Sequence, residues 1–233
     1  MRTALAFSPH LDDAAFSAGG TLARLARRGW RVVIATVFTR TVPNPQGFAL
    51  ACQLDKGLPP EADYMAIRRA EDLAACAALG STARHLPFAE APHRGYHDAS
   101  ALFAGVRSGD EEARRLAPAL AALTEEVAPD LILGPRAVGA HVDHLVVRAA
   151  LETLPRPRML LWTDWPYAGR TDAPDPHAAD DASARSLAVP VRDLPAKLAA
   201  CAAYATQLGF QFGGEAGMRA SVEAVRTERF LAV

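Results

Sequence analysis

The sequence predicts an α/β fold of three layers: a Rossmann-like, mostly parallel sheet with helices on both faces. Two observations lead to this prediction. Short continuous apolar runs alternate along the chain with segments whose apolar residues recur every three to four positions. Continuous apolar runs are typical of strands covered on both faces, as in parallel sheets. Strand and helix in alternation imply right-handed crossovers and a doubly wound sheet.

The elements follow in order along the chain. The expected strands are residues 3–8, 31–38, 84–88, 130–134 and 158–162. The expected helices are residues 19–29, 61–80, 110–127, 141–154 and 193–207. Gly29 and Gly80 stand where helix C-caps place glycine. The polar, proline-bearing segment 167–186 is predicted to be a surface loop.

Composition indicates one globular domain over residues 1–233. Half of the residues are hydrophobic and 22% are charged, which suits a soluble protein with a sizeable core. The 25 Lys+Arg and 26 Asp+Glu nearly cancel, so no global field favours nucleic acid or an anionic membrane. We therefore expect a small-molecule partner and no binding of nucleic acid.

The sequence also gives limited information on the cellular compartment and the oligomeric state. The sequence has no stretch of transmembrane length and no secretory signal, so we expect a cytoplasmic protein without membrane insertion. Three separated cysteines without a CxxC pair argue against a disulfide framework and a thiolate zinc site. The apolar surface would allow a homo-oligomer, but the sequence does not indicate the number of subunits.

Clusters of histidine and aspartate follow two of the predicted strands. One lies in "SPHLDD" after the first strand, and the other lies in "GPRAVGAHVDH" after the fourth. Their members are His10, Asp12, Asp13, His141, Asp143 and His144. Ligands bind outside the carboxyl ends of the strands in doubly wound sheets, so we expect both clusters on one edge.

These residue types suit zinc. A catalytic zinc takes three protein ligands and leaves a position for water, and histidine nitrogen and carboxylate oxygen are suitable donors. His10 and Asp13 would supply two ligands, and one histidine of the HxxH pair would supply the third. Either motif alone recurs by chance, and the two aspartates could simply cap a helix beginning near Gly20. Together they favour a site, because several polar groups beside an apolar core are costly without partners.

Three stretches also carry a resemblance to a known family. "SPHLDDAAFSAGG" is similar to the AHPDDE signature of the PIG-L/LmbE-like zinc de-N-acetylases. "IRRAEDLAACAALG" resembles the RxxE helix of that family, and "HVDH" resembles its HPDH signature, in the same order. The family includes enzymes that deacetylate N-acetylglucosaminyl conjugates, among them intermediates of mycothiol, bacillithiol and GPI-anchor synthesis. The fold known for the family agrees with the one predicted above.

The resemblance implies a role for each matching residue. His10, Asp13 and His144 would be the zinc ligands. Asp12 would be the general base that takes a proton from water, beside a zinc ion that lowers the pKa of that water.

His141 would stabilise the oxyanion or protonate the leaving amine, and Asp143 would orient or charge the ring of His141 through its other nitrogen. Arg68 would contact a sugar hydroxyl or a carboxylate of the substrate, its alternative being a surface salt bridge with Glu71 or Asp72. Arg94, in the loop 90–98, is the other expected substrate contact.

The chain also departs from the family pattern. Leu11 stands where proline is common and Ala14 where glutamate is common. No tyrosine precedes His141 by two residues, where some relatives place one. Trp162, Trp165 and Tyr167 are expected either in the core or as a wall that stacks on a sugar.

The sequence thus predicts a zinc-dependent hydrolase that removes acetyl from an N-acetylated amino sugar or an N-acetylglucosaminyl conjugate. An amidohydrolase for a different acyl amide is one alternative. Gly19 and Gly20 after a strand would also suit a non-catalytic nucleotide-binding module, but no GxGxxG follows that strand and the acidic turn would repel pyrophosphate. A zinc-binding regulatory protein without turnover is the third reading, and it would not require Asp12.

Overall fold

The computed structural model describes residues 1–155 and 158–233. Within these residues a seven-stranded sheet has the order β3-β2-β1-β4-β5-β7-β6. Its strands are β1 (Thr3–Ser8), β2 (Arg31–Thr36), β3 (Thr82–His85), β4 (Leu131–Pro135), β5 (Met159–Trp162), β6 (Arg185–Pro190) and β7 (Thr227–Ala232). Strands β1 to β5 pair in parallel, whereas β7 is antiparallel to both of its neighbours.

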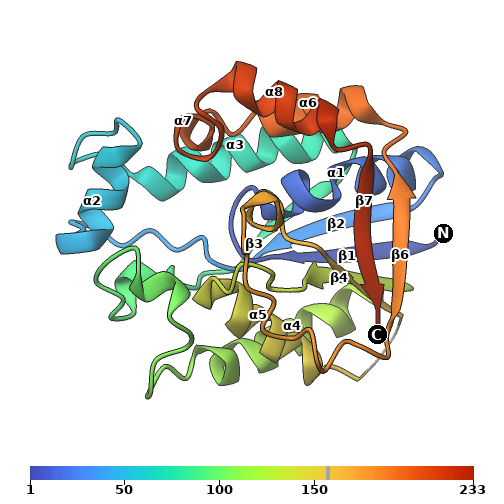
Figure 1. Cartoon of the computed structure of the whole chain (residues 1–233), viewed down its shortest axis with the longest axis horizontal. Helices are drawn as coiled ribbons and strands as arrows, with labels where there is room; N and C mark the ends of the chain where they lie inside the picture. Colours follow the sequence, from blue (N-terminus) through green and yellow to red (C-terminus); the bar gives the residue numbers. More distant parts are fainter. Residues whose placement is uncertain (156–157) are drawn as a thin grey trace.

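Helices cover both faces of the sheet. They are α1 (Asp13–Arg27), α2 (Gly47–Asp55), α3 (Tyr64–Leu79), α4 (Glu112–Val127), α5 (Val142–Glu152), α6 (Leu194–Ala202), α7 (Ala205–Phe212) and α8 (Glu215–Ala224). Figure 1 shows α1, α3, α6 and α8 on one face and α4 and α5 on the other. One apolar core lies under each group of helices. The predicted three-layer α/β fold is confirmed.

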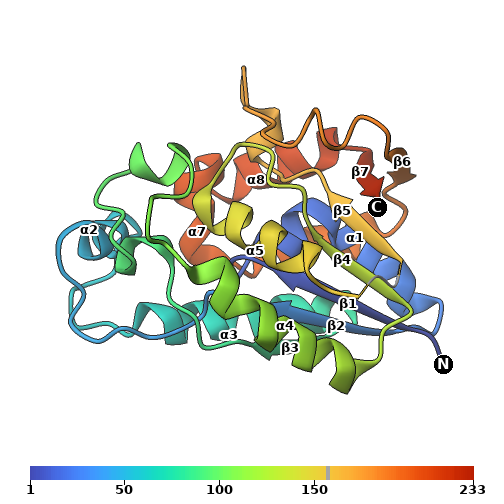
Figure 2. The same ribbon diagram turned by 90° about the horizontal axis from the view of Figure 1, so that it is seen from below.

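The carboxyl ends of the parallel strands form the functional end of the sheet. In Figure 1 the arrows of β1 and β2 point toward the side of the molecule that carries α2 and α7. The same end is seen from below in Figure 2, where α2 lies beyond the ends of the strands. Among the described residues, no helix is both long and apolar enough to cross a membrane.

The expected elements are present with shifted boundaries. The third strand ends at His85 and does not continue to residue 88, because Pro87 has no backbone N–H to donate to the ladder. The late helix expected at 193–207 is two helices, α6 and α7. Helices α2 and α8 and strands β6 and β7 were not predicted.

Gly19 and Gly20 lie inside α1, which begins at Asp13, six residues before the expected start. A Cβ on Gly20 would come within 2.9 Å of Val191 Cγ1, and one on Gly19 would come within 3.3 Å of Lys197 Cγ. Both glycines therefore permit close helix packing. They do not form a phosphate-binding turn, so the nucleotide-binding alternative loses the feature that suggested it.

A buried ion pair joins α6 to β7 beneath α1. Lys197 Nζ lies 2.7 Å from Glu228 Oε1, and the two side chains are only 2% and 1% exposed. The Glu228 carboxylate also accepts hydrogen bonds from the backbone N–H groups of Gly20 and Thr21 and from the Thr21 hydroxyl. This one carboxylate therefore ties the middle of α1 to a strand more than 200 residues later.

Replacing Glu228 by Ala is expected to lower the free energy of unfolding by about 3–5 kcal/mol, because Lys197 is left buried without its partner. Urea denaturation followed by circular dichroism measures the change. Glu215→Ala is the matched control, since its pair with Arg219 is solvent-exposed and its loss should change stability by roughly 0.5 kcal/mol or less. Equal midpoints for both variants would contradict the role given to Glu228.

Candidate active site

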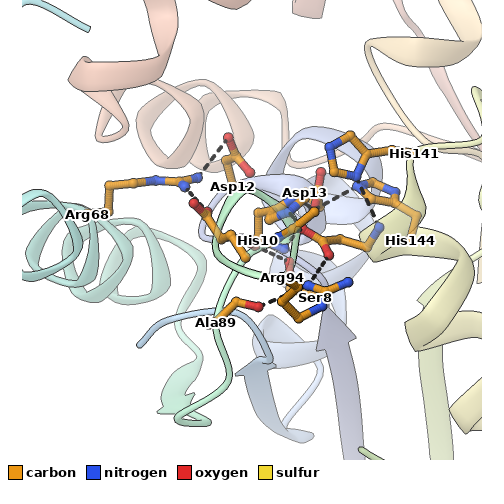
Figure 3. Close-up of polar contacts among 12 residues, drawn as sticks. Ser8, His10, Asp12, Asp13, Arg68, Ala89, Arg94, His141 and His144 are labelled. Carbon is orange, nitrogen blue, oxygen red and sulfur yellow. Dashed lines mark hydrogen bonds and ion pairs between the residues drawn. The ribbon is translucent and has the colours of Figure 1, made fainter. Parts of the chain in front are cut away.

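The two histidine and aspartate clusters meet at the carboxyl ends of adjacent strands. Strands β1 and β4 are neighbours in the sheet, so the turn after β1 and the start of α5 lie side by side. His10 Nε2 is 2.9 Å from Asp143 Oδ2, although the two residues are 133 positions apart. Figure 3 shows the side chains of both clusters converging. The prediction that they share one edge is confirmed.

Three possible metal ligands converge on one point. Asp13 Oδ2 lies 3.2 Å from His10 Nδ1 and 3.2 Å from His144 Nε2. One ligand atom from each of these residues lies within 4.8 Å of the other two. His144 is fully buried and comes from α5, whereas His10 and Asp13 come from the turn that opens α1. The spacing of the donor atoms suits a single cation.

The turn after β1 sets two of these side chains. The Ser8 hydroxyl donates to the His10 carbonyl and accepts from the Ala14 N–H, and the His10 N–H donates to Asp13 Oδ2. Leu11 and Ala14 point into the apolar core and are almost fully buried. The two departures from the family signature are therefore core-packing positions here.

Each histidine of the group is held by a carboxylate on its far side. His10 Nε2 bonds Asp143, and His144 Nδ1 lies 2.8 Å from Asp164 Oδ1. When these nitrogens carry the hydrogen, His10 Nδ1 and His144 Nε2 present lone pairs toward Asp13, which is the arrangement of metal-binding histidines. Sequence reasoning missed Asp164. Its only signal is its place just after β5, at the same end of the sheet.

The electrostatics of the group favour positive charge at the convergence point. Burial opposes the charged form of His144, but Asp13 and Asp164 outweigh it and raise the pKa of His144 to about 9. Burial likewise opposes the Asp13 anion, yet His144 and His10 hold the pKa of Asp13 well below its usual range. His144 Nε2 is buried and, although it lies 3.2 Å from Asp13 Oδ2, forms no hydrogen bond of acceptable geometry with any described residue. A cation bound by His10, Asp13 and His144 would satisfy both observations.

Asp12 lies next to this group with its own cationic partner. Its carboxylate is 3.5 Å from Arg68 Nη2, and Arg68 Nη1 lies 2.6 Å from Glu90 Oε1 (Figure 3). Burial and the adjacent Asp13 raise the pKa of Asp12 to about 6, against the opposing effect of Arg68. A carboxylate with such a pKa is suited to accept a proton near neutral pH.

Arg68 lines the cleft described below and pairs with Asp12 and Glu90, so the surface salt bridge with Glu71 or Asp72 that was considered for it is not formed. Its side chain is 5% exposed, and its Nε has no hydrogen-bond partner within the described part of the chain. A substrate contact by Arg68 is compatible with this position and stays a prediction.

His141 is the N-cap residue of α5. Its Nδ1 accepts a hydrogen bond from the Asp143 backbone N–H, so the ring hydrogen is on Nε2. Burial and the neighbouring His10 lower the pKa of His141 to about 3, which keeps the ring neutral. The ring is therefore placed to donate a hydrogen bond from Nε2.

The loop before His141 is conformationally strained. Ala137 and Ala140 have φ angles of 68° and 58°, values that residues with a side chain seldom adopt. Gly139 has φ 94°, and a Cβ there would lie 2.6 Å from Tyr167 Cβ. The loop thus presses against Tyr167, whose ring lies 6.1 Å from that of His141. Tyr167 lines the cleft, which is one of the two positions predicted for it.

The predicted contact between the Asp143 side chain and the ring of His141 was wrong. Its carboxylate accepts bonds from His10, from the Ala91 N–H and from Arg94, and only its backbone N–H reaches His141. The peptide geometry at the start of α5 explains this, because the N-cap bond occupies His141 Nδ1. Asp143 therefore orients the metal-site histidine, His10, through its side chain.

The expectation for Arg94 was also wrong. Arg94 Nη1 lies 2.6 Å from Asp143 Oδ1, and its Nη2 lies 3.1 Å from Asp110 Oδ2. The side chain is 9% exposed and is not among the residues lining the cleft. A fully buried Asp143 carboxylate needs a cation, and Arg94 provides it. Its guanidinium is therefore occupied behind the site.

A cleft of about 410 Å³ opens above these residues. Its floor contains His10, Asp12, Asp13, Arg68, Glu90, His141 and Asp143. Its walls come from α2, from the 3₁₀ turns η2 (Ala101–Phe103) and η3 (Tyr167–Gly169), and from α7. The volume is within the range of small-molecule sites.

Helix α7, one wall of the cleft, is fastened to α3. Glu71 accepts hydrogen bonds from the Thr206 N–H and hydroxyl at the start of α7. The Tyr204 hydroxyl donates to Asp72 Oδ1, and His85 Nε2 lies 2.8 Å from the other oxygen of Asp72. His85 is thus a strand residue whose ring has a hydrogen-bond partner.

Comparison with known proteins finds relatives of this chain by sequence and by structure. The family model described as GlcNAc-PI de-N-acetylase (PIG-L) matches residues 5–154. 2'-N-acetylparomamine deacetylase of Streptomyces fradiae is 37% identical over 180 residues, which are 73% of this chain and 60% of that protein. The match thus spans less than two thirds of that relative.

Two solved structures are similar over almost their whole length. The zinc-inhibited form of teicoplanin deacetylase Orf2 has a TM-score of 0.79 and 27% identity, covering 99% of this chain and 97% of the other. The A40926 pseudoaglycone deacetylase Dbv21 has a TM-score of 0.78 and 28% identity, covering 99% and 96%. With the matched residues 5–154 containing both clusters, the chain belongs to the GlcNAc-PI de-N-acetylase (PIG-L) family.

Proposed function

We propose that the protein is a zinc-dependent hydrolase that removes the acetyl group from an N-acetylated amino sugar or its conjugate. One observation carries the proposal: ligand atoms of His10, Asp13 and the buried His144 converge where His10 and Asp13 line the floor of a cleft, beside the carboxylate of Asp12. A purely structural zinc would need the three ligands but not Asp12. The deacetylases named among the relatives support the same reaction class.

The donor set fits zinc, which readily binds two imidazoles and one carboxylate and keeps a position open for water. When bound, zinc would polarise the amide carbonyl and lower the pKa of a water molecule toward about 7. His10 and His144 would hold the ion, each oriented by the carboxylate behind it. Asp13 would supply the negative charge.

The proton path is assigned to Asp12. Its carboxylate accepts a proton from the attacking water, and the resulting carboxylic acid delivers that proton to the nitrogen of the leaving amine as the C–N bond breaks. Acetate and a free amine are the products. Arg68, 3.5 Å from Asp12 and paired with Glu90, keeps the carboxylate turned toward the cleft.

His141 is assigned to the oxyanion that develops on the amide carbonyl. Its Nε2–H is free to donate because Nδ1 is occupied by the Asp143 N–H. With a pKa of about 3 this ring is scarcely protonated near neutral pH, so it has no additional proton to give to the amine. Of its two predicted roles, stabilising the oxyanion is therefore the better supported.

Purified protein tests the proposal through metal content and acetate release. We expect about one zinc per chain, and release of acetate from N-acetylglucosaminyl conjugates or N-acetylated aminoglycosides that stops with a chelator and returns with zinc. Bound zinc without acetate from any substrate, but with cleavage of other acyl amides, would favour the alternative amidohydrolase. Absence of bound metal would contradict the site itself.

A further inference from the structure

The segment between η3 and β6, residues 170–184, is named the polar loop here, and it contains a buried charge. Most of the loop is exposed, but Asp181 is only 5% exposed. Its Oδ2 lies 3.0 Å from Arg136 Nε and its Oδ1 lies 2.9 Å from Arg148 Nη2. Arg136 Nη2 also lies 2.8 Å from Asp175 Oδ2 of the same loop. Because a buried carboxylate is costly unless it is paired, these ion pairs anchor the polar loop to the domain.

The two arginines belong to the segments that carry the histidines of the site. Arg136 directly follows β4 and precedes residues 137–140, which we name the strained loop and which lead to His141. Arg148 lies on α5, four residues after His144 and therefore on the same face of that helix. The polar loop thus contacts both sides of the connection from β4 to α5.

Contacts from the chain that follows β5 hold the strained loop in its conformation. The Val138 N–H donates to Asp164 Oδ2 at 2.9 Å, and the Gly139 N–H donates to the Pro174 carbonyl of the polar loop at 2.7 Å. The two alanines of the strained loop have positive φ angles. Such conformations persist only where the surrounding structure over-determines them. The path of the backbone into His141 therefore depends on the polar loop.

We propose that Arg136 and Asp181 are positioning residues: their ion pair holds the polar loop on the strained loop and so directs the Nε2–H of His141 toward the developing oxyanion. Neither Arg136 nor Asp181 is among the described residues that line the cleft, so both act through another residue. The Nδ1 atom of His141 is bound to a backbone N–H of its own helix, so the path of the backbone sets the direction of the ring. The inference rests on the proposed function, in which His141 stabilises the oxyanion.

Asp181→Asn and Arg136→Gln are each expected to lower kcat roughly 10- to 100-fold, because a donor displaced by a fraction of an ångström stabilises the transition state less. KM and zinc affinity should stay within about twofold of wild type. The assay uses metal-loaded protein and the N-acetylated sugar that the wild type deacetylates fastest. Arg136→Gln leaves Asp181 paired with Arg148, so it serves as the test if Asp181→Asn does not fold.

Asp180→Asn is the matched control for Asp181→Asn. It makes the same chemical change one residue earlier, where the side chain is 80% exposed and lies 3.9 Å from His177 Nδ1. We expect wild-type kcat for this variant. An equal loss in Asp180→Asn and Asp181→Asn would overturn the inference, as would wild-type kcat in both Asp181→Asn and Arg136→Gln.

A double-mutant cycle with His141→Ala distinguishes positioning from a general loss of structure. His141→Ala alone is expected to lower kcat roughly 100- to 1000-fold, as for the loss of an oxyanion donor. If Asp181 acts through His141, then Asp181→Asn lowers kcat less than about twofold further in the His141→Ala background. The same fold-loss in both backgrounds would overturn the inference, because Asp181 would then act on another part of the site.

Amide hydrogen exchange tests the contact between the two loops without the reaction. In Arg136→Gln we expect the N–H groups of Val138 and Gly139 to exchange at least about tenfold faster than in wild type. Faster exchange, together with a wild type that releases no acetate from any substrate, would retain the contact and refute the proposed reaction. Unchanged exchange would overturn the inference, and acetate release by the wild type would then still support the reaction.

Discussion

Asp12→Asn is expected to lower kcat roughly a hundredfold to ten-thousandfold while zinc stays bound. The amide cannot accept the proton of the attacking water, but it preserves the volume of the side chain and can still face Arg68. Asp12 is not one of the three converging ligand residues, so metal content should equal that of the wild type. Acetate release and metal analysis on the same preparation measure both quantities.

The control for Asp12→Asn is another change from carboxylate to amide. Glu126 lies on α4, away from the cleft, and forms an exposed ion pair with Arg84 of β3. Glu126→Gln should therefore leave kcat unchanged. Turnover of Asp12→Asn within a few-fold of wild type would refute the assignment of the general base. Loss of zinc in this variant would instead make Asp12 a ligand.

His144→Ala is expected to lose zinc almost entirely, and activity with it, because one of three protein ligands is removed. The affinity is measured by competition with a chelator. Asp164→Asn provides a graded comparison, since it keeps all three ligands and weakens only the orientation of His144. Loss of such a supporting carboxylate typically weakens metal affinity by roughly 10- to 100-fold. We therefore expect wild type to bind tightest, Asp164→Asn next and His144→Ala weakest.

His144 is also fully buried, so its replacement can lower stability on its own. Circular dichroism and urea unfolding of the metal-free proteins show whether His144→Ala remains folded. A folded variant with wild-type zinc affinity would move the third ligand to another residue, and His141 with Asp143 and His10 form the next candidate group.

The sequence indicated the centre of the site better than its surroundings. The fold and the meeting of the two clusters were predictable because β1 and β4 are continuous apolar runs whose ends carry short-range motifs. Asp164 was not predictable, since it belongs to no motif and depends on β5 lying beside β4. Arg94 looked like a free loop cation. It pairs with Asp143, 49 positions away, because that buried carboxylate needs a cation, and the local sequence does not show this.

Strands β6 and β7 show the same limit at the level of the fold. In "TERFLA" the buried Glu228 stands where an apolar residue would mark a strand, because its partner is the buried Lys197 and not solvent. A polar residue read without its partner suggests a surface turn. Paired burial of opposite charges thus hid the antiparallel edge of the sheet.

Helix α7 is joined to α3 through Glu71 and Asp72, while the convergent ligand atoms are set by β1 and β4. The residues of α7 that line the cleft can therefore be substituted without moving His10 or Asp13. After gene duplication, a few substitutions in α7 could change the range of substrates of one copy while its catalytic residues stay the same. Paralogues would then differ in sequence at the wall of the cleft before they differ at its floor.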